Sequence, residues 1–295
     1  MKRLIAAMLL LSAAVPCWAG EAMDAIRAHG VLRVGTTGDY KPFSFRKADG
    51  SYTGADIVLA GRLANRLGVK LQIVPTAWAT LLPDFVAGQY DVAMGGVSVT
   101  PPRAGKGTFS TVTFVDGKRP VARCADQDRF VSVEAIDQPG VRVVVNPGAT
   151  NEEFARARFP HATLTVHPNN ATVFDEIVAN RADVMVTDGI EVDHQSFLHP
   201  ELCPAHVSAP FTRLEKAYLL PRDPDLAALV NAWLADERGS GVRPDHDGGA
   251  AGTVAARQTE RCSPDAGVHS PIPVGTTWAA PAGWRCGRTR RAPSP

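Results

Sequence analysis

ADIVLAGRLANRLGVKLQIV, residues 55–74, holds a helical pattern that ends at a glycine and is followed at once by a strand. Apolar side chains recur at helical spacing from Ile57 to Leu67. Gly68 lies where glycine commonly ends a helix, and Lys70 to Val74 follows as the strand. A helix leading into a strand is the repeating unit of α/β proteins.

The same alternation extends on both sides of this stretch. A strand is expected at 31–34, before a loop rich in Gly and Pro, and a second helix at 81–86 precedes a strand at 91–94. The order strand, helix, strand, helix, strand predicts a parallel sheet. Ligand-binding loops are then expected at the carboxyl ends of its strands.

A second pattern of the same kind begins after residue 140. A strand at 141–145 stops at an Asn-Pro-Gly turn, a helix is capped from Thr150, and further strands are expected at 164–166 and 183–186 around a helix at 173–178. Two segments, 112–121 and 215–220, should cross between the patterns. We expect two lobes with a cleft between them: lobe 1 at 20–118, lobe 2 at 119–213 and a return to lobe 1 at 214–238.

Bulk composition disfavours nucleic acid and membrane surfaces as partners. The chain has 295 residues, enough to bury a sizeable core, and its 31 basic and 30 acidic residues give a net charge of +1. The chain therefore has no strong overall electrostatic field that would attract an anionic polymer or an anionic lipid surface. Specificity must come from a local site.

The first nineteen residues, 1–19, are typical of a secretory signal peptide. Lys2 and Arg3 precede an apolar run over 4–14, and Ala19 is a small residue of the kind that signal peptidase accepts. The run is too short to span a bilayer. We expect export to the periplasm, with no membrane association after cleavage; a buried first helix is the alternative.

Export makes the cysteines informative, because disulfides persist in oxidising compartments. Once Cys17 is removed with the signal, four cysteines remain: Cys124, Cys203, Cys262 and Cys286. Cys124 and Cys203 lie near the start and the end of lobe 2, so we predict a bridge that ties the two edges of that lobe together. Two separate thiols stay open, since four cysteines allow three connectivities. No Cys-x-x-Cys motif or Cys/His cluster suggests a metal.

Several short motifs occur in the order seen in a known family. They are Thr37 to Phe43, Gly54 to Asp56, Thr100 to Arg103 followed by Phe109-Ser110, Gly148 to Thr150, and Thr187-Asp188. Over residues 23–234 the chain resembles the family 3 solute-binding proteins. The resemblance implies a two-lobed, periplasmic-binding-protein-like (type II) α/β fold with a central ligand cleft.

Four longer motifs are more particular: Asp116 to Lys118, Asn146 to Glu152, His199 to Cys203, and Glu215 to Asp223. They resemble the cyclohexadienyl dehydratase branch of the family, whose members convert prephenate to phenylpyruvate and arogenate to phenylalanine. The resemblance implies a small, dianionic cyclohexadienyl substrate and no cofactor or metal. An amino-acid-binding subunit of a membrane transporter is the alternative function, and the sequence leaves open a homo-oligomer.

Carboxylate binding is expected from both lobes. Arg103 follows a strand, and a guanidinium can bind a carboxylate through two parallel hydrogen bonds. The resemblance implies that Arg103 holds the side-chain carboxylate of the substrate. Without the resemblance, the interpretation is a surface arginine in a Pro-rich turn. Opposite it, Gly148 to Thr150 precede a helix N-terminus, which attracts anions.

Other site residues are implied by the same resemblance. Tyr40 and Trp78 should stack around the ligand, while Phe43 can equally belong to the core. Ser98 should offer its hydroxyl to the bound carboxylate, and Asp188 matches the residue that pairs with an amino group in amino-acid binders. Supporting roles are expected for Asp39, Lys41, Lys118, Asn146 and Asn151.

Glu191 is the expected catalytic residue. Loss of the ring hydroxyl and of carbon dioxide from prephenate needs a proton donor for the departing oxygen. A buried carboxyl group can serve, because burial raises its pKa towards working pH. The resemblance implies this role for Glu191; without it, the residue reads as a solvated glutamate at the start of a helix.

The C-terminal segment, 239–295, departs from the family pattern. It is rich in Gly, Pro, Ala, Arg and Thr and lacks both hydrophobic periods, so we expect it to be disordered. An out-of-frame reading of a GC-rich gene would explain its abrupt start, and a natural disordered tail is the alternative. A missing final helix would leave apolar surface of lobe 1 uncovered.

Overall fold

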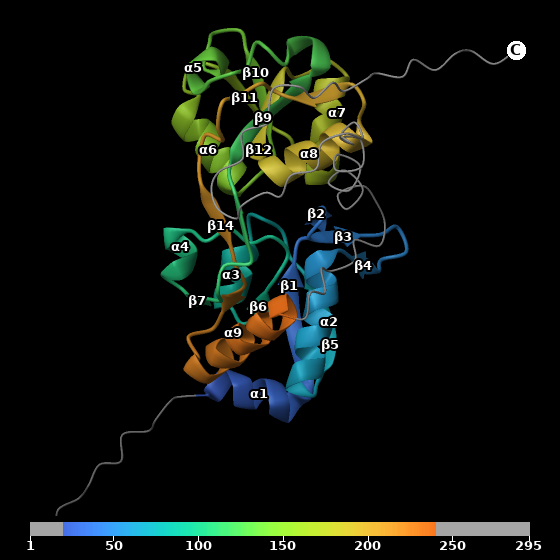
Figure 1. Cartoon of the computed structure of the whole chain (residues 1–295), viewed down its shortest axis with the longest axis vertical. Coiled ribbons are helices and arrows are strands. Elements are labelled where there is room, and N and C mark those ends of the chain that lie inside the picture. The colour runs from blue at the N-terminus through green and yellow to red at the C-terminus, as the bar shows by residue number, and fades with distance from the viewer. Residues whose placement is uncertain (1–19, 240–295) are drawn as a thin grey trace, which may run out of the picture. The chain divides into compact units, whose positions relative to one another are not determined.

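The computed structural model describes residues 20–239, which form two α/β lobes (Figure 1). The predicted signal peptide, 1–19, and residues 240–295 of the C-terminal segment lie outside the described residues, as do Cys17, Cys262 and Cys286. The prediction of a two-lobed α/β fold is confirmed. Within residues 20–239 there is no helix long and apolar enough to cross a membrane.

Lobe 1 is built on a five-stranded sheet in the order β5-β1-β6-β15-β7. Its strands are β1 (Val31–Thr36), β5 (Lys70–Pro75), β6 (Val92–Ala93), β7 (Thr108–Phe109) and β15 (Leu219–Leu220). Its helices are α1 (Glu21–His29), α2 (Ala55–Leu67), α3 (Leu81–Val86), α4 (Pro101–Ala104) and α9 (Pro224–Gly239). A small sheet of β2 (Asp39–Tyr40), β3 (Ser44–Arg46) and β4 (Tyr52–Thr53) completes the lobe.

The core of lobe 1 lies between this sheet and its helices. Helix α2 ends at Gly68, whose left-handed conformation (φ 75°) is readily adopted by glycine. The buried face of α2 carries Leu63 and Leu67, which belong to the same core cluster as Leu32 of β1 and Trp233 of α9. Each such side chain contributes about 1.5–3 kcal/mol when it is fully buried. The helix α9 therefore supplies apolar cover to the lobe.

Lobe 2 repeats the layered arrangement with a sheet in the order β11-β10-β12-β9-β13. Its strands are β9 (Lys118–Arg123), β10 (Arg142–Val145), β11 (Thr163–Val166), β12 (Val184–Asp188) and β13 (Leu202–Pro204). Its helices are α5 (Val133–Ile136), α6 (Thr150–Arg158), α7 (Val173–Val178) and α8 (Gly189–Leu198), with short 3₁₀ turns η1 (Cys124–Asp126) and η2 (Asn170–Thr172).

The inner strand β10 of the second sheet is covered on both faces, which explains its run of three valines. Val143 and Val145 pack into one core cluster, whereas Val144 between them packs into the other. Successive side chains of a strand point to opposite faces, so a strand covered on both sides is apolar throughout. This accounts for the three valines at 143–145, whereas Arg142 at the start of β10 forms an ion pair with Asp183.

The three strands predicted for lobe 1, β1, β5 and β6, are parallel to one another as expected, but the complete sheets of both lobes are mixed. In lobe 1, β15 runs antiparallel to β6 and β7. In lobe 2, β9 runs antiparallel to β12 and β13. The strands β9 and β15 directly follow the two crossing segments, so they enter their sheets from the other lobe and not through a helix of the same lobe. Local helix and strand patterns carry no sign of that direction.

The crossing segments form a two-stranded antiparallel ribbon, β8 (Phe114–Asp116) with β14 (Leu214–Lys216). The carbonyl oxygen of Lys216 accepts hydrogen bonds from the backbone N of Thr113 at 2.7 Å and from its hydroxyl at 3.0 Å. Lys216 also makes an isolated antiparallel bridge with Ser98. The backbone of Lys216 is thus fixed at the junction of the two lobes.

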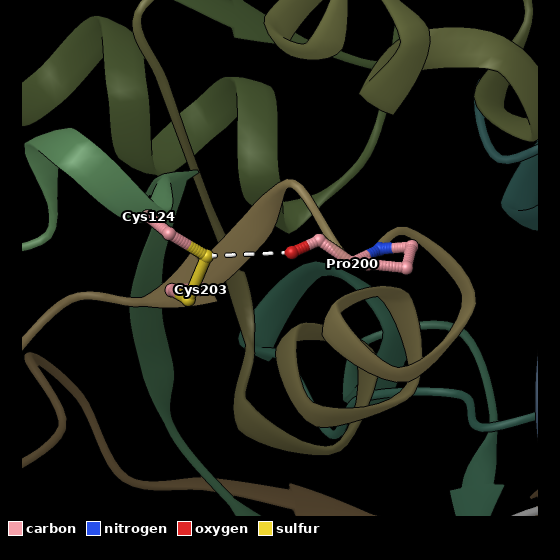
Figure 2. Close-up of a disulfide and its surroundings, with 3 residues drawn as sticks. All are labelled: Cys124, Pro200 and Cys203. Carbon is pink, nitrogen blue, oxygen red and sulfur yellow. Dashed lines mark hydrogen bonds between the residues drawn. A yellow bond between two sulfur atoms is a disulfide. The ribbon is translucent and has the colours of Figure 1, made fainter. Parts of the chain in front are cut away.

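Lobe 2 contains a disulfide between Cys124 and Cys203, with Cα atoms 4.7 Å apart (Figure 2). Cys124 directly follows β9 and Cys203 lies on β13, which pairs with β9. The carbonyl oxygen of Pro200 lies 3.6 Å from the Cys124 sulfur. The predicted pairing of Cys124 with Cys203 is confirmed. The bridge does not tie the two edges of the lobe together, because it joins the neighbouring strands β9 and β13 at one side of the sheet.

Candidate active site

A cavity between the lobes is lined by side chains of both. Lobe 1 contributes Tyr40, Trp78, Gly96, Ser98, Arg103 and Lys216, and lobe 2 contributes Asn146, Ala149, Thr150, Asn151, Asn170, Asp188 and Glu191. Four of these residues are ionisable acids or bases of the Asp, Glu, Lys and Arg types. The cavity is therefore polar and charged, which suits a small ionic ligand.

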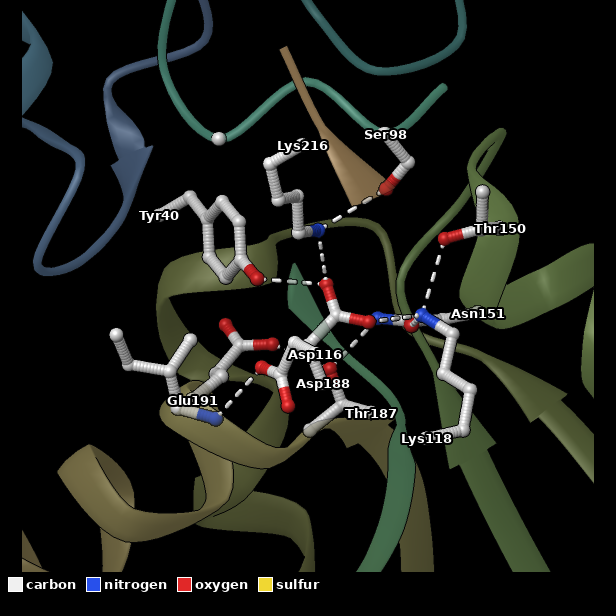
Figure 3. A network of polar contacts seen from close by, with 12 residues as sticks. Tyr40, Ser98, Asp116, Lys118, Thr150, Asn151, Thr187, Asp188, Glu191 and Lys216 are labelled. Carbon is white, nitrogen blue, oxygen red and sulfur yellow. Dashed lines mark hydrogen bonds and ion pairs between the residues drawn. The ribbon is translucent and has the colours of Figure 1, made fainter. Parts of the chain in front are cut away.

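Asp188, the last residue of β12, is the centre of the polar network (Figure 3). Its Oδ1 lies 2.8 Å from the Lys118 ammonium, and its Oδ2 accepts a hydrogen bond from the Tyr40 hydroxyl at 2.6 Å and another from Lys216. Tyr40 and Lys216 belong to lobe 1, whereas Asp188 belongs to lobe 2. Lys118, which the expected boundary placed at the end of lobe 1, is the first residue of β9 in the sheet of lobe 2. One carboxylate thus connects the two lobes directly.

The two lysines determine the ionisation of Asp188. Burial alone would raise its pKa, but Lys216 and Lys118 hold that pKa well below its usual range. Both ammonium groups are almost completely buried, with side-chain exposures of 1% for Lys118 and 2% for Lys216. Asp188 is therefore an ionised carboxylate whose charge is compensated within the protein.

A chain of hydrogen bonds runs from Lys118 to Glu191. Lys118 donates to the Thr150 hydroxyl at 3.0 Å and to the side-chain oxygen of Asn151. Asn151 in turn donates to Asn146 at 2.9 Å and to the Thr187 hydroxyl at 3.0 Å. Thr187 donates to Glu191 Oε2 at 2.5 Å. These polar groups fix one another in the wall of the cavity.

Glu191 is the third residue of α8, and two residues of the crossing segment 112–121 accept hydrogen bonds from the first turn of this helix. The Asp116 carboxylate accepts a hydrogen bond from the backbone N of Ile190 at 2.9 Å, and the Gly117 carbonyl accepts one from Gly189 at 2.9 Å. These bonds satisfy amide groups that have no partner inside the helix. The start of α8, and with it the Glu191 side chain, is therefore well positioned.

Burial raises the pKa of Glu191 to about 7. The residue is only 3% exposed, and the negative charge of Asp188 raises the pKa further, while the hydrogen bond from Thr187 and the Lys118 charge lower it. A carboxyl group with this pKa is partly protonated at neutral pH and can donate a proton. The alternative reading of Glu191 as a solvated residue is wrong, since it is buried.

Arg103 lies on α4 at the lobe 1 wall and is buried. Its Nη1 donates to the Ser98 carbonyl at 2.9 Å, and burial lowers its pKa from the usual value. The reading of Arg103 as a surface arginine is thus wrong. The opposing wall holds Ala149 and Thr150, at the start of α6, where the helix carries partial positive charge.

Gly148 allows the lobes to approach closely at this point. Its φ is +70°, and a Cβ atom there would lie 2.4 Å from the Cβ of Ala79 in lobe 1. Its backbone N donates to Glu152 Oε2 at 2.6 Å. Any larger residue would both strain the backbone and push Ala79 away, so glycine is required for this geometry.

Within residues 20–239 there is no group of three or more His, Cys, Asp or Glu side chains placed to hold a metal ion. The charged groups of the cavity are instead engaged in the ion pairs and hydrogen bonds described above.

The profile of the bacterial extracellular solute-binding proteins, family 3, matches residues 32–243. The chain belongs to this family. A cyclohexadienyl dehydratase of Pseudomonas aeruginosa is 49% identical over 237 residues, which cover 80% of this chain and 88% of the relative. The L-cystine-binding protein TcyJ of Escherichia coli K12 is 26% identical over 241 residues, 81% of this chain and 89% of the relative.

Among solved structures of the family, an ancestral amino acid-binding protein described as a precursor of cyclohexadienyl dehydratase superposes with a TM-score of 0.69. It is 37% identical and covers 74% of this chain and 94% of its own. The family thus contains both an enzyme and amino-acid binders on one fold. Function must be argued from the site.

The aromatic wall of this family member is formed by Tyr40 and Trp78. Their rings meet edge to face with centroids 5.7 Å apart, and Trp78 Nε1 donates to Asp39 Oδ1 at 3.0 Å. Phe43 packs against Tyr40 with centroids 5.1 Å apart but does not line the cavity, so it belongs to the core.

Asp39 and Lys41 are not brought into the cavity lining. The Asp39 carboxylate orients Trp78, and burial raises its pKa from the usual value. The Lys41 ammonium lies 4.0 Å from the centroid of Phe45. A direct substrate contact is therefore geometrically supported for neither residue, although Asp39 can act by holding Trp78.

Lys216 and Asn170 line the cavity but were not singled out by the sequence. Lys216 lies in a crossing segment, for which the sequence predicts only a connecting role, and a single lysine in a strand gives no sign that it is buried. Asn170 donates to the Asp39 carbonyl at 3.1 Å, and its side-chain oxygen is buried without a partner among residues 20–239. That oxygen is a candidate ligand contact.

Proposed function

We propose that this protein is a cyclohexadienyl dehydratase, which converts prephenate to phenylpyruvate and arogenate to phenylalanine with Glu191 as the general acid. The observation that carries the proposal is a buried carboxyl group on the cavity wall whose pKa is raised to about 7. A binding protein has no need of such a proton donor. The 49% identity to a relative of that name supports the same assignment.

In this proposal the two carboxylates of the substrate are held from both lobes. Arg103 binds the side-chain carboxylate, and the N-terminus of α6 at Thr150 attracts anionic groups from the opposite wall. Tyr40 and Trp78 provide an apolar face for the six-membered ring. A substrate held in this way lies next to Glu191, so the proton transfer takes place within one complex.

The chemistry needs one proton and no redox partner. Glu191 donates its proton to the ring hydroxyl, and the carbon–oxygen bond breaks with release of water. The bond from the ring to its carboxylate carbon breaks in the same conversion and releases carbon dioxide, and its electron pair completes the aromatic ring. Glu191 then takes a proton from solvent. One proton is consumed for each prephenate, which loses one water and one carbon dioxide.

The hydrogen-bonded chain behind Glu191 tunes this donor. Thr187 donates to Oε2, which leaves the other carboxyl oxygen to carry the proton. Asn151 holds Thr187, and Lys118 holds Asn151, so the orientation of the carboxyl group is set by buried neighbours. A well-oriented acid near its pKa is the arrangement that general acid catalysis requires.

The decisive experiment is an assay of the purified mature protein with prephenate. Formation of phenylpyruvate, followed by its absorbance, supports the proposal. Tight binding of an amino acid without any conversion of prephenate would instead support the alternative of a transporter subunit. We propose the periplasm as the location, which detection of the mature protein in an osmotic-shock fraction tests.

A further inference from the structure

Lys216 fills the position in the cavity where an ammonium group of a ligand would find its counter-ion. Its Nζ contacts Asp188 Oδ2, lies 3.0 Å from the Ser98 hydroxyl and sits 5.0 Å from the centroid of the Tyr40 ring. A carboxylate, a hydroxyl and an aromatic face are the groups that bind an ammonium ion. Here the protein supplies that ion itself.

Asp188 is consequently not available to a ligand cation. Of the two acids in the cavity lining, Glu191 is partly protonated at neutral pH and Asp188 is ionised. The Oδ1 of Asp188 is taken by Lys118, and its Oδ2 is taken by Tyr40 and Lys216. An added ammonium would have to displace a lysine or lie beside it.

The charges around the cavity lead to the same conclusion. Arg103, Lys118 and Lys216 carry three positive charges, and Asp188 carries one negative charge. With Glu191 protonated, a ligand with two carboxylates and no cation balances the net charge of these four groups. A ligand with two carboxylates and an ammonium leaves one positive charge uncompensated in a buried site, where charges are costly.

We propose that Lys216 is a specificity-determining residue that makes the site select the α-keto substrate over the corresponding α-amino substrate. The inference rests on the function proposed above, for which prephenate and arogenate are such a pair. The Lys216 ammonium has three hydrogens and two hydrogen-bonding partners among residues 20–239, so it can donate the third to a keto oxygen. An ammonium in the place of that oxygen would meet a like charge.

The first test compares prephenate and arogenate as substrates of the parent and of Lys216→Met, which keeps the length of the side chain and removes its charge. The parent should prefer prephenate in kcat/KM by about tenfold or more, since like charges placed together cost several kcal/mol. In Lys216→Met that ratio should fall about tenfold or more, with arogenate turnover affected least. An unchanged ratio would overturn the assignment.

Lys118→Met is the matched control, because it removes the same charge from the same carboxylate. Lys118 does not line the cavity, so its loss opens no place for a ligand ammonium. Its effect on the substrate ratio should be clearly smaller than that of Lys216→Met. Equal shifts in the two variants would mean that net charge sets the preference, and the specific role of Lys216 would be lost.

A measurement on the parent keeps the proposal testable if the variants do not fold. Phenylpyruvate and L-phenylalanine differ at one carbon, which carries a keto oxygen in the first and an ammonium and a hydrogen in the second, and calorimetry gives their dissociation constants. Phenylpyruvate should bind about tenfold or more tightly. Equal or tighter binding of L-phenylalanine would overturn the role of Lys216, whereas a parent that turns over neither substrate would overturn the dehydratase function.

Discussion

Asp188 and Glu191 lie three residues apart, at the end of β12 and in the first turn of α8, and both are buried in the wall of one cavity. The pKa values of the two carboxyl groups are nevertheless shifted in opposite directions. Lys118 and Lys216 hold the pKa of Asp188 well below its usual range, whereas burial raises the pKa of Glu191 to about 7. The difference comes from the partners, since burial is common to both.

The partners differ because of where each side chain enters the network. Asp188 meets two ammonium groups and a phenol directly. Glu191 is hydrogen-bonded to the neutral hydroxyl of Thr187, and the charge of Lys118, which makes no direct contact with it, does not offset the loss of its hydration. Two carboxyl groups whose pKa values are driven apart are typical of acid–base sites, and here one is a fixed charge and the other a proton carrier.

The largest expected effect comes from removing the proton carrier. Glu191→Gln keeps the size and polarity of the side chain but removes the transferable proton. Turnover of prephenate should fall by about 10²- to 10⁴-fold, while binding of phenylpyruvate is retained because Arg103 holds its single carboxylate independently of Glu191. The assay is phenylpyruvate formation, with binding followed by calorimetry.

Glu201→Gln, an exposed glutamate of the same lobe, is the control and should keep the activity of the parent. Near-normal turnover by Glu191→Gln would show that the proton comes from another group. In that case the contrast between the two carboxyl groups would be electrostatic but not catalytic.

Removing the fixed charge should act on stability. Asp188→Asn leaves Lys118 and Lys216 buried without their counter-ion, and breaking a buried pair in this way costs about 3–5 kcal/mol. Urea denaturation measures the change in the free energy of unfolding. Asp193→Asn, which breaks an exposed pair between Asp193 of α8 and Arg119 of β9, is the control and should cost less than about 1 kcal/mol.

An Asp188→Asn protein as stable as the Asp193→Asn protein would contradict this account of the network. It would mean that water or the ligand, and not Asp188, compensates the two lysines. The ranking of the two variants is therefore more informative than either value.

The pH dependence of kcat/KM should distinguish the role of Glu191 from that of Asp188. Glu191 must be protonated to donate, so kcat/KM for prephenate should fall up to tenfold for each pH unit above about 7. The measurement is a rate profile from pH 6 to 9. A profile that stays flat to pH 9 would contradict a donor with this pKa.

The free energy of unfolding should depend on pH through the same two carboxyl groups, with opposite signs. Because the folded-state pKa of Glu191 is raised from 4.5 to about 7, folding becomes less favourable as pH rises through this window, and the cost is on the order of 3 kcal/mol above it. Asp188 has a lowered pKa, so its contribution is present above pH 4 and is lost only in stronger acid. Glu191→Gln should therefore be stabilised relative to the parent at pH 8 and not at pH 4.

How much of this could be read from the sequence depends on whether a feature is local. The helix α2 and its stop at Gly68 were predictable because periodicity and a glycine terminus lie within fifteen residues. The direction of β15 was not, since it depends on a strand that arrives from the other lobe. Resemblance to a family pointed to Glu191 and Asp188, whereas their pKa shifts required knowledge of burial.

Lys216 shows the same limit most clearly. Its partners Ser98 and Asp188 are 118 and 28 residues away, so no local pattern could reveal the contact. Lys41, by contrast, lies close to Tyr40 in the sequence but turns to Phe45 and away from the cavity lining. Proximity along the chain is a poor guide to which charge reaches a site.

The smallest expected effect tests whether more distant charges tune Glu191. Asp39 accepts a hydrogen bond from Trp78 and lies outside the cavity lining. Its negative charge raises the pKa of Glu191 by less than the negative charge of Asp188 does. Asp39→Asn keeps an acceptor for Trp78 Nε1 and removes the charge, so the alkaline limb of the rate profile should move to lower pH. The shift should be smaller than in Asp188→Asn, because the Coulomb interaction weakens with distance. Profiles of the two variants recorded in the same buffers measure this order. Should Asp39→Asn move the limb further than Asp188→Asn, the two lysines compensate Asp188 so completely that its charge no longer reaches Glu191, and burial with Asp39 would then set the proton donor.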